Sequence, residues 1–141
     1  MPISFKPPLI VIGVSPRRYS HRLILETGEF VINIPTKDIV EQTVYCGTVS
    51  GRDHNKFKET GLTPVPASKV KPPLIKECVS HLECKVIAKY KCGDHTLIVG
   101  RVIAVQVNEE MINEILNIEK AQTISHRGNK YYTPKLIYKA K

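Results

Sequence analysis

Two long apolar stretches joined by a short turn constrain the fold of this chain more than any other feature. Apolar and polar residues partly alternate over residues 79–90, and a second apolar run covers residues 96–107. Cys92-Gly93-Asp94-His95 supplies turn residues between them, so we expect a long antiparallel hairpin. Strands of this length bend or coil, as the strands of barrels do. The hairpin therefore predicts a mainly β chain, built as an antiparallel barrel with short inserted helices.

The alternation also assigns side chains to faces of the first strand. We expect Leu82, Cys84, Val86 and Ala88 on one face and His81, Glu83, Lys85 and Lys89 mostly on the other. Gly100 interrupts the second stretch. A glycine there predicts a β-bulge, or a close approach by another backbone or a ligand.

Residues 9–34 predict a strand, a helix and a second strand. Residues 9–14 are apolar and bounded by prolines, which is typical of a short buried strand. The apolar residues 23–25 precede Thr27-Gly28, which should end a short helix, and residues 29–34 form the next strand.

A basic turn lies between the first of these strands and the helix. Its sequence is Ser15-Pro16-Arg17-Arg18-Tyr19-Ser20. A helix N-terminus offers free N–H groups, and two guanidinium groups and two hydroxyls beside it favour a phosphate. The alternative is an ordinary helix start with solvated arginines.

The remaining segments predict short elements between strands. We expect helices over residues 38–42, 54–59 and 111–118, with Thr36 capping the first and Gly61 ending the second. Residues 63–73 hold four prolines and should be extended and irregular. Tyr131-Tyr132, after Gly128, predicts one more short strand.

A second candidate binding segment is Cys46-Gly47-Thr48-Val49-Ser50-Gly51-Arg52. It reads as a loop of small and polar residues, whose backbone N–H groups can approach a flat ring or polar oxygens. The alternative is a simple turn between helices.

Composition narrows the class of protein. With 141 residues the chain predicts a single domain over residues 1–141, and its net charge of +8 favours anionic partners. The positive residues are spread along the chain, which argues against nucleic acid. No apolar run is long enough to span a bilayer and no signal-peptide pattern is present, so we expect a cytoplasmic protein.

The sequence contains no strong catalytic motif. The four cysteines lack zinc-site spacing, so no metal is expected, and the five histidines are scattered. If the protein is an enzyme, a bound cofactor should carry the chemistry.

Several segments, in order, carry a family resemblance. They are Pro2-Ile3-Ser4-Phe5-Lys6-Pro7-Pro8, Arg18-Tyr19-Ser20, Thr27-Gly28-Glu29-Phe30-Val31-Ile32-Asn33-Ile34-Pro35, Tyr45-Cys46-Gly47, Ser50-Gly51-Arg52-Asp53, Lys56-Phe57, Gly93-Asp94-His95 with Gly100, and Tyr131-Tyr132. Together they resemble the flavin reductase-like, FMN-binding split-barrel family, which includes the flavoredoxins. The resemblance implies a homodimeric split β-barrel that holds FMN close to the subunit interface.

The resemblance also implies roles for individual residues. The expected cofactor-binding residues fall into two regions. In the first, Arg18 and Ser20 bind the phosphate with Arg17 beside them, and Val14 and Ser15 lie near the flavin ring. In the second, the loop that meets the cofactor contains Cys46, Gly47, Ser50 and Gly51, and Lys56 with Phe57 braces that loop. His95 lies where the family often has a histidine, which makes it a candidate catalytic residue. The segment that begins at Met1 corresponds to a point after a flavin-contacting strand of other members, so we expect that N-terminal strand to be missing.

Three functions remain open at this point. The first is an FMN-dependent oxidoreductase that passes electrons from NAD(P)H or another carrier through the flavin. The second is a non-catalytic FMN-binding or electron-carrier protein. The third is a basic barrel that binds nucleic acid, which the spread of charge disfavours.

Overall fold

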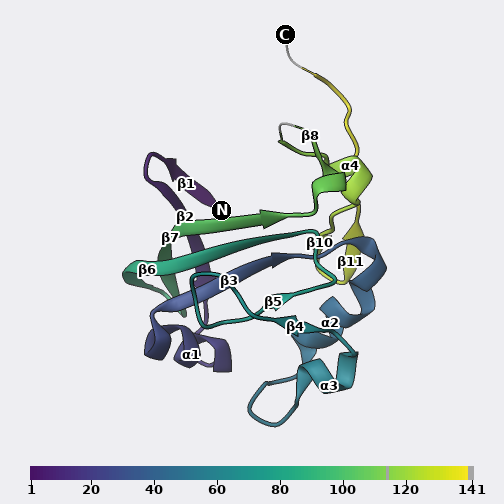
Figure 1. The fold of residues 1–141 in the computed structure, drawn as a ribbon. Helices are drawn as coiled ribbons and strands as arrows, with labels where there is room; N and C mark the ends of the chain where they lie inside the picture. The colour runs from purple at the N-terminus through teal and green to yellow at the C-terminus, as the bar shows by residue number, and fades with distance from the viewer. Residues whose placement is uncertain (114, 140–141) are drawn as a thin grey trace.

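A five-stranded antiparallel sheet organises the computed structural model, which describes residues 1–113 and 115–139. Its strands lie in the order β1-β2-β7-β6-β3, and the sheet twists strongly along its length (Figure 1). The five strands are β1 (Pro2–Phe5), β2 (Pro8–Val14), β3 (Glu29–Ile34), β6 (Ser80–Cys92) and β7 (His95–Val107). The prediction of a mainly β, antiparallel architecture with short helices is confirmed.

The long hairpin of β6 and β7 forms as predicted. Ser80 pairs with Val107 at one end and Cys92 with His95 at the other. The turn itself is Gly93-Asp94, and Gly93 adopts a φ of 57°, a left-handed conformation that glycine accepts without strain. The hairpin is the centre of the sheet, because β2 pairs with β7 and β3 pairs with β6.

Gly100 occupies a crowded point of this sheet. Opposite it, the register of β6 shifts between Val86 and Ala88, so the predicted bulge lies on the partner strand. The close approach is made by a side chain, since a Cβ on Gly100 would lie 2.5 Å from Phe30 Cζ. Of the predicted alternatives, the bulge is therefore present, and the group that lies close to Gly100 is the ring of Phe30.

Two apolar clusters form the interior. One packs between the sheet and α1 (Tyr19–Thr27) around Phe30, Cys84 and Ile98. The other, around Ile39, Leu62 and Cys78, joins the smaller helices to the irregular segment that follows them. Cys46 and Phe57 pack at the edge of the second cluster, so this cluster supports one of the candidate binding segments.

The helices agree with the predictions in place but not in length. α1 ends at Gly28, which has the predicted left-handed conformation with a φ of 68°. The helix expected at 54–59 is α3 (Lys56–Thr60), capped by the Asn55 side chain. The helix expected at 38–42 starts as a 3-10 turn, Lys37–Ile39, and continues as α2 (Val40–Thr48). Thr36 stands at the start of that turn without a capping side-chain bond, so its predicted role was wrong.

The helix predicted over residues 111–118 does not form. A 3-10 turn, Glu109–Met111, leads into the short strands β8 (Ile112–Asn113) and β9 (Ile115–Leu116), and only then comes α4 (Ile118–Ala121). Residue 114 lies outside the described residues. Ile112 and Ile115 are β-branched, and such side chains favour extended backbone over helix.

The C-terminal part ends as predicted, in a short strand. β10 (Ser125–Arg127) and β11 (Lys130–Tyr132) form a hairpin that lies beside α2 in Figure 1. Among the described residues, no helix is long and apolar enough to cross a bilayer.

The proline-rich segment is extended and irregular, as predicted. Apart from the short pair β4 (Pro64–Val65) and β5 (Leu74–Ile75), it runs as a strap across β3 and β6. Side chains of those two strands accept its backbone N–H groups: Glu29 from Lys71, and Glu83 from Ser68 and Lys69. The polar face of β6 is therefore covered at Glu83, which is fully buried.

Candidate functional site

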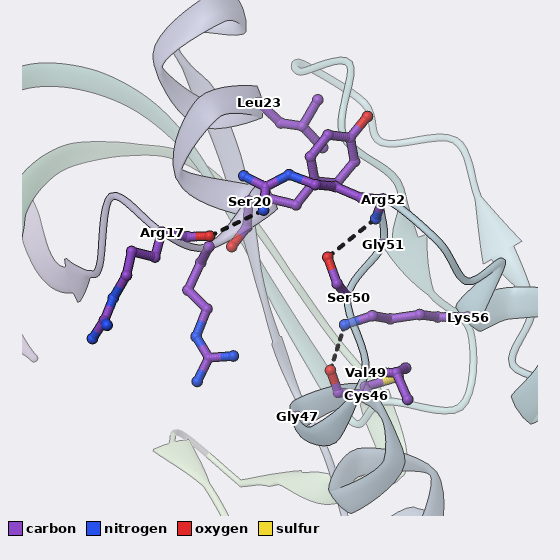
Figure 2. Close-up of a pocket in the computed structure, with 12 residues that line it drawn as sticks. Arg17, Ser20, Leu23, Cys46, Gly47, Val49, Ser50, Gly51, Arg52 and Lys56 are labelled. Carbon is purple, nitrogen blue, oxygen red and sulfur yellow. Dashed lines mark hydrogen bonds between the residues drawn. The ribbon is translucent and has the colours of Figure 1, made fainter.

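A pocket of about 540 Å³ lies between the N-terminal turn of α1 and the segment that follows α2 (Figure 2). Its lining residues are Arg17, Arg18, Tyr19, Ser20, Leu23, Cys46, Gly47, Val49, Ser50, Gly51, Arg52 and Lys56. One wall is fixed by the β2–α1 turn and the other by the end of α2, the loop after it and the start of α3. The pocket thus joins the two segments that the sequence singled out.

Eight of the predicted cofactor-binding residues meet in this pocket. They are Arg17, Arg18, Ser20, Cys46, Gly47, Ser50, Gly51 and Lys56. Four predicted residues lie elsewhere. Phe57 packs against the second core cluster and lines an adjoining hollow. Val14 and Ser15 sit at and just after the end of β2 without lining the pocket, and His95 lines a separate hollow at the tip of the β6–β7 hairpin, with Nδ1 2.7 Å from Asp94 Oδ1.

Cys46 and Gly47 lie in the last turn of α2, so the prediction of a loop at these two residues was wrong. Helix α2 continues to Thr48, because Val49 is the first residue to leave helical geometry and its N–H still bonds to the carbonyl of Tyr45. Only residues 49–52 of the predicted loop are non-helical. On this side the pocket is therefore bounded by the C-terminus of α2 and by the loop of residues 49–52 that follows it.

The charge of the lining selects for an anion. Arg17, Arg18, Arg52 and Lys56 contribute four cations, and the lining contains no aspartate or glutamate. The Lys56 ammonium donates to the Cys46 carbonyl, which points it along the pocket wall in Figure 2. A phosphate is the ligand group that such a set of cations binds best.

Helix α1 adds backbone donors on the opposite wall. At its start the His21 N–H bonds to the Arg18 carbonyl, while the N–H groups of Tyr19 and Ser20 have no intrahelical acceptor. The Arg18 side chain at the cap position makes no capping bond. Nearby, Ser15 Oγ is buried, and it is the one buried side-chain oxygen or nitrogen of the described residues without a hydrogen-bond partner. A polar ligand or water at this turn would satisfy it. The backbone donors at the start of α1 fit a phosphate group.

Arg52 is the one charged residue of the pocket lining to which the sequence assigned no role. Its Nη1 donates to the Arg17 carbonyl at 3.2 Å, and its Cζ lies 5.7 Å from the centre of the Tyr19 ring. The sequence did contain a signal for Arg52, because it is the one cation within the small, polar segment of residues 46–52.

A polar cluster braces α2 against α3 beneath the pocket. The Tyr45 hydroxyl donates to Glu59 Oε2 at 2.6 Å, and His54 Nδ1 lies 3.1 Å from the same oxygen. The hydrogen bond to this carboxylate raises the pKa of Tyr45 and lowers the pKa of Glu59. The cluster holds the helix that carries Lys56 in place.

The twisted antiparallel sheet with helices inserted between its strands is the split barrel of flavin reductases. A family model described as flavin reductase like domain matches residues 1–130. The chain therefore belongs to the flavin reductase-like family, and the predicted resemblance is confirmed.

Known proteins place the chain within this family. Over 105 residues it is 44% identical to an uncharacterized protein of Archaeoglobus fulgidus, which covers 74% of this chain and 59% of that protein. It is 32% identical over 102 residues to an NADH-dependent flavin reductase of Rhodococcus sp, covering 71% and 52% of the two chains. The flavoredoxin of Desulfovibrio vulgaris (Miyazaki F) superposes on the whole chain and on 77% of its own length, with a TM-score of 0.91 and 30% identity. The chain thus spans about six tenths of the length of the Archaeoglobus relative.

Proposed function

We propose that this chain binds FMN and acts as an oxidoreductase that takes electrons from NAD(P)H or another carrier. The observation that supports the proposal most is the pocket, where two segments far apart in sequence bring four cations and the start of a helix together. The similarity to an NADH-dependent flavin reductase and to a flavoredoxin supports the same function.

Different residues would bind different parts of the cofactor. Arg18 and Ser20, with Arg17, would hold the phosphate at the start of α1, and Cys46, Gly47, Ser50 and Gly51 would bound the pocket, with Lys56 bracing it. Val14 and Ser15 would lie nearer to the ring. When bound, FMN supplies a ring that accepts and donates hydride, so the protein contributes position, charge and exclusion of water. His95 is proposed as a candidate catalytic residue outside the pocket.

We further propose that the protein is a cytoplasmic homodimer. Strand β1 stands at the edge of the sheet, where Phe5 is 89% exposed and Ile3 is 47% exposed. An exposed apolar edge strand favours pairing with a second chain. The molar mass in solution, measured by light scattering, tests the dimer.

The cofactor is tested by titration and reduction. Purified protein should quench the fluorescence of added FMN at a stoichiometry of one per chain, and NADH or NADPH should then bleach the flavin absorbance. A protein that binds FMN but is reduced only by dithionite would be an electron carrier without nicotinamide chemistry. A titration without any fluorescence change would contradict the proposal.

The phosphate site predicts different losses for two ligands. Arg18→Ala and Ser20→Ala should each raise the Kd for FMN at least about 10-fold while changing the Kd for riboflavin little, because a charge-assisted hydrogen bond is worth about 1.5–3 kcal/mol. Fluorescence titration of both ligands measures this. Equal losses for FMN and riboflavin would show that the phosphate lies elsewhere.

A further inference from the structure

Arg52 joins the two walls of the pocket. It belongs to the loop between α2 and α3, and its Nη1 reaches the carbonyl of Arg17 at 3.2 Å. Within residues 1–113 and 115–139, this is the hydrogen bond that connects the loop to the N-terminal turn of α1. The backbone beside it packs on Tyr19, since a Cβ on Gly51 would lie 3.2 Å from the Tyr19 ring.

The guanidinium of Arg52 has binding capacity left. Of its five N–H donors, the contact with Arg17 uses one. Arg52 lines the candidate pocket and also an adjoining hollow of about 530 Å³, so this residue borders open space on both sides. Its present acceptor is a neutral carbonyl, and a phosphate oxygen forms a stronger, charge-assisted and often bidentate pair with arginine.

The neighbouring cations Lys56 and Arg22 differ from Arg52 in the contacts that they already make. Lys56 already donates to the Cys46 carbonyl on the pocket wall. Arg22 also lies over the Tyr19 ring, with Cζ 4.9 Å from its centre, but it pairs with Glu26 at 3.3 Å and does not line the pocket. Arg52 is thus the cation of the 49–55 loop that faces the pocket and can reach across it to α1.

We propose that Arg52 is a specificity-determining residue that selects the phosphorylated flavin. In this assignment, which rests on the proposed FMN site, the guanidinium leaves the Arg17 carbonyl and binds the FMN phosphate. The carbonyl of Arg17 and the ring of Tyr19 hold the side chain near the phosphate position beforehand, which reduces the entropy lost on binding.

The test compares Arg52→Ala, Arg52→Lys and the control Arg22→Ala in titrations with FMN and riboflavin. Arg52→Ala should raise the Kd for FMN about 10- to 100-fold and leave that for riboflavin within about 2-fold, given the strength of charged hydrogen bonds. Arg52→Lys should restore part of the preference, because it keeps the charge without the planar fork. Arg22→Ala should keep the preference of the unmodified protein.

A second readout reports on the guanidinium directly. The Arg52 Nε–Hε resonance should shift on addition of FMN and stay in place with riboflavin. If Arg52 only supports the pocket wall, Arg52→Ala will weaken both ligands equally, and this result overturns the inference. It is also overturned if Arg52→Ala binds FMN as tightly as the unmodified protein. Failure of the unmodified protein to bind FMN is a different result, which contradicts the proposed function.

Discussion

Replacing Gly100 with alanine should destabilise the protein by about 3 kcal/mol, at the upper end of what overpacking a core costs. The added Cβ would lie 2.5 Å from Phe30 Cζ, 2.7 Å from Phe30 Cε1 and 3.1 Å from Cys84 Cβ. Phe30 is 4% exposed and Cys84 is fully buried, so neither can move away without disturbing the sheet. Denaturant unfolding measures the change, and the melting temperature should fall by roughly 10 °C.

Two further variants isolate this clash. Phe30→Leu shortens the side chain that fills the space, so in that background Gly100→Ala should cost less than about 1 kcal/mol, a coupling expected of residues in contact. Gly13→Ala, on the neighbouring strand, places its Cβ at an ordinary 3.9 Å from Leu97 Cδ2, so its effect should stay within about 0.5 kcal/mol. Equal costs of Gly100→Ala in both backgrounds would contradict the explanation.

Gly100 also shows how far the sequence alone could predict this fold. The alternation in residues 79–107 predicted the hairpin, and a glycine inside a strand pattern predicted a bulge or a crowded point. The identity of the crowding group was out of reach, because Phe30 arrives from a strand about seventy residues away through the pairing of β3 with β6. Local pattern predicts that space is scarce, while tertiary pairing decides which group fills it.

The candidate site was also predictable in its local segments but not in the tertiary contacts between them. The basic turn and the small, polar segment each have a local signature, and the family resemblance joined them before the structure did. The structure adds their meeting in one pocket and the reach of Arg52 to the Arg17 carbonyl. It also moves Cys46 and Gly47 into α2, because helix propagation over small residues depends on the packing of Cys46 against the second core cluster.

The alternation of apolar and polar residues was least informative about the polar face of β6, which the structure buries. Alternation correctly separates Cys84 from Glu83 on β6, but it does not reveal that the polar face lies under the proline-rich strap. Glu83 is 0% exposed, and its oxygens accept hydrogen bonds from Ser68 N, Ser68 Oγ, Lys69 N and Gln106 Nε2. A buried carboxylate with this many donors fixes the strap to the sheet.

Removing this carboxylate is expected to have the largest effect on stability in the molecule. Glu83→Ala should cost about 4 kcal/mol, because it leaves several buried donors unsatisfied and opens a cavity. Glu83→Gln should cost about 2 kcal/mol, since its amide keeps one acceptor oxygen and turns an NH₂ group toward the donors. Glu29→Ala is the matched control. Glu29 accepts a single N–H of the same strap, from Lys71 at 2.8 Å near the surface, so its loss should cost about 1 kcal/mol or less.

The pH dependence of stability gives this prediction a second, independent readout. Burial alone raises the pKa of Glu83, but the hydrogen bonds from Ser68, Lys69 and Gln106 outweigh burial and set the pKa below its ordinary value. A folded-state pKa below that of the unfolded chain stabilises the protein above the unfolded pKa, about 4.3, and this stabilisation is lost as the pH falls through the folded pKa. Glu83→Gln should therefore flatten the dependence of the unfolding free energy on pH in the acid range. If the acid limb is as steep in Glu83→Gln as in the unmodified protein, Glu83 is not the ionised anchor of the strap.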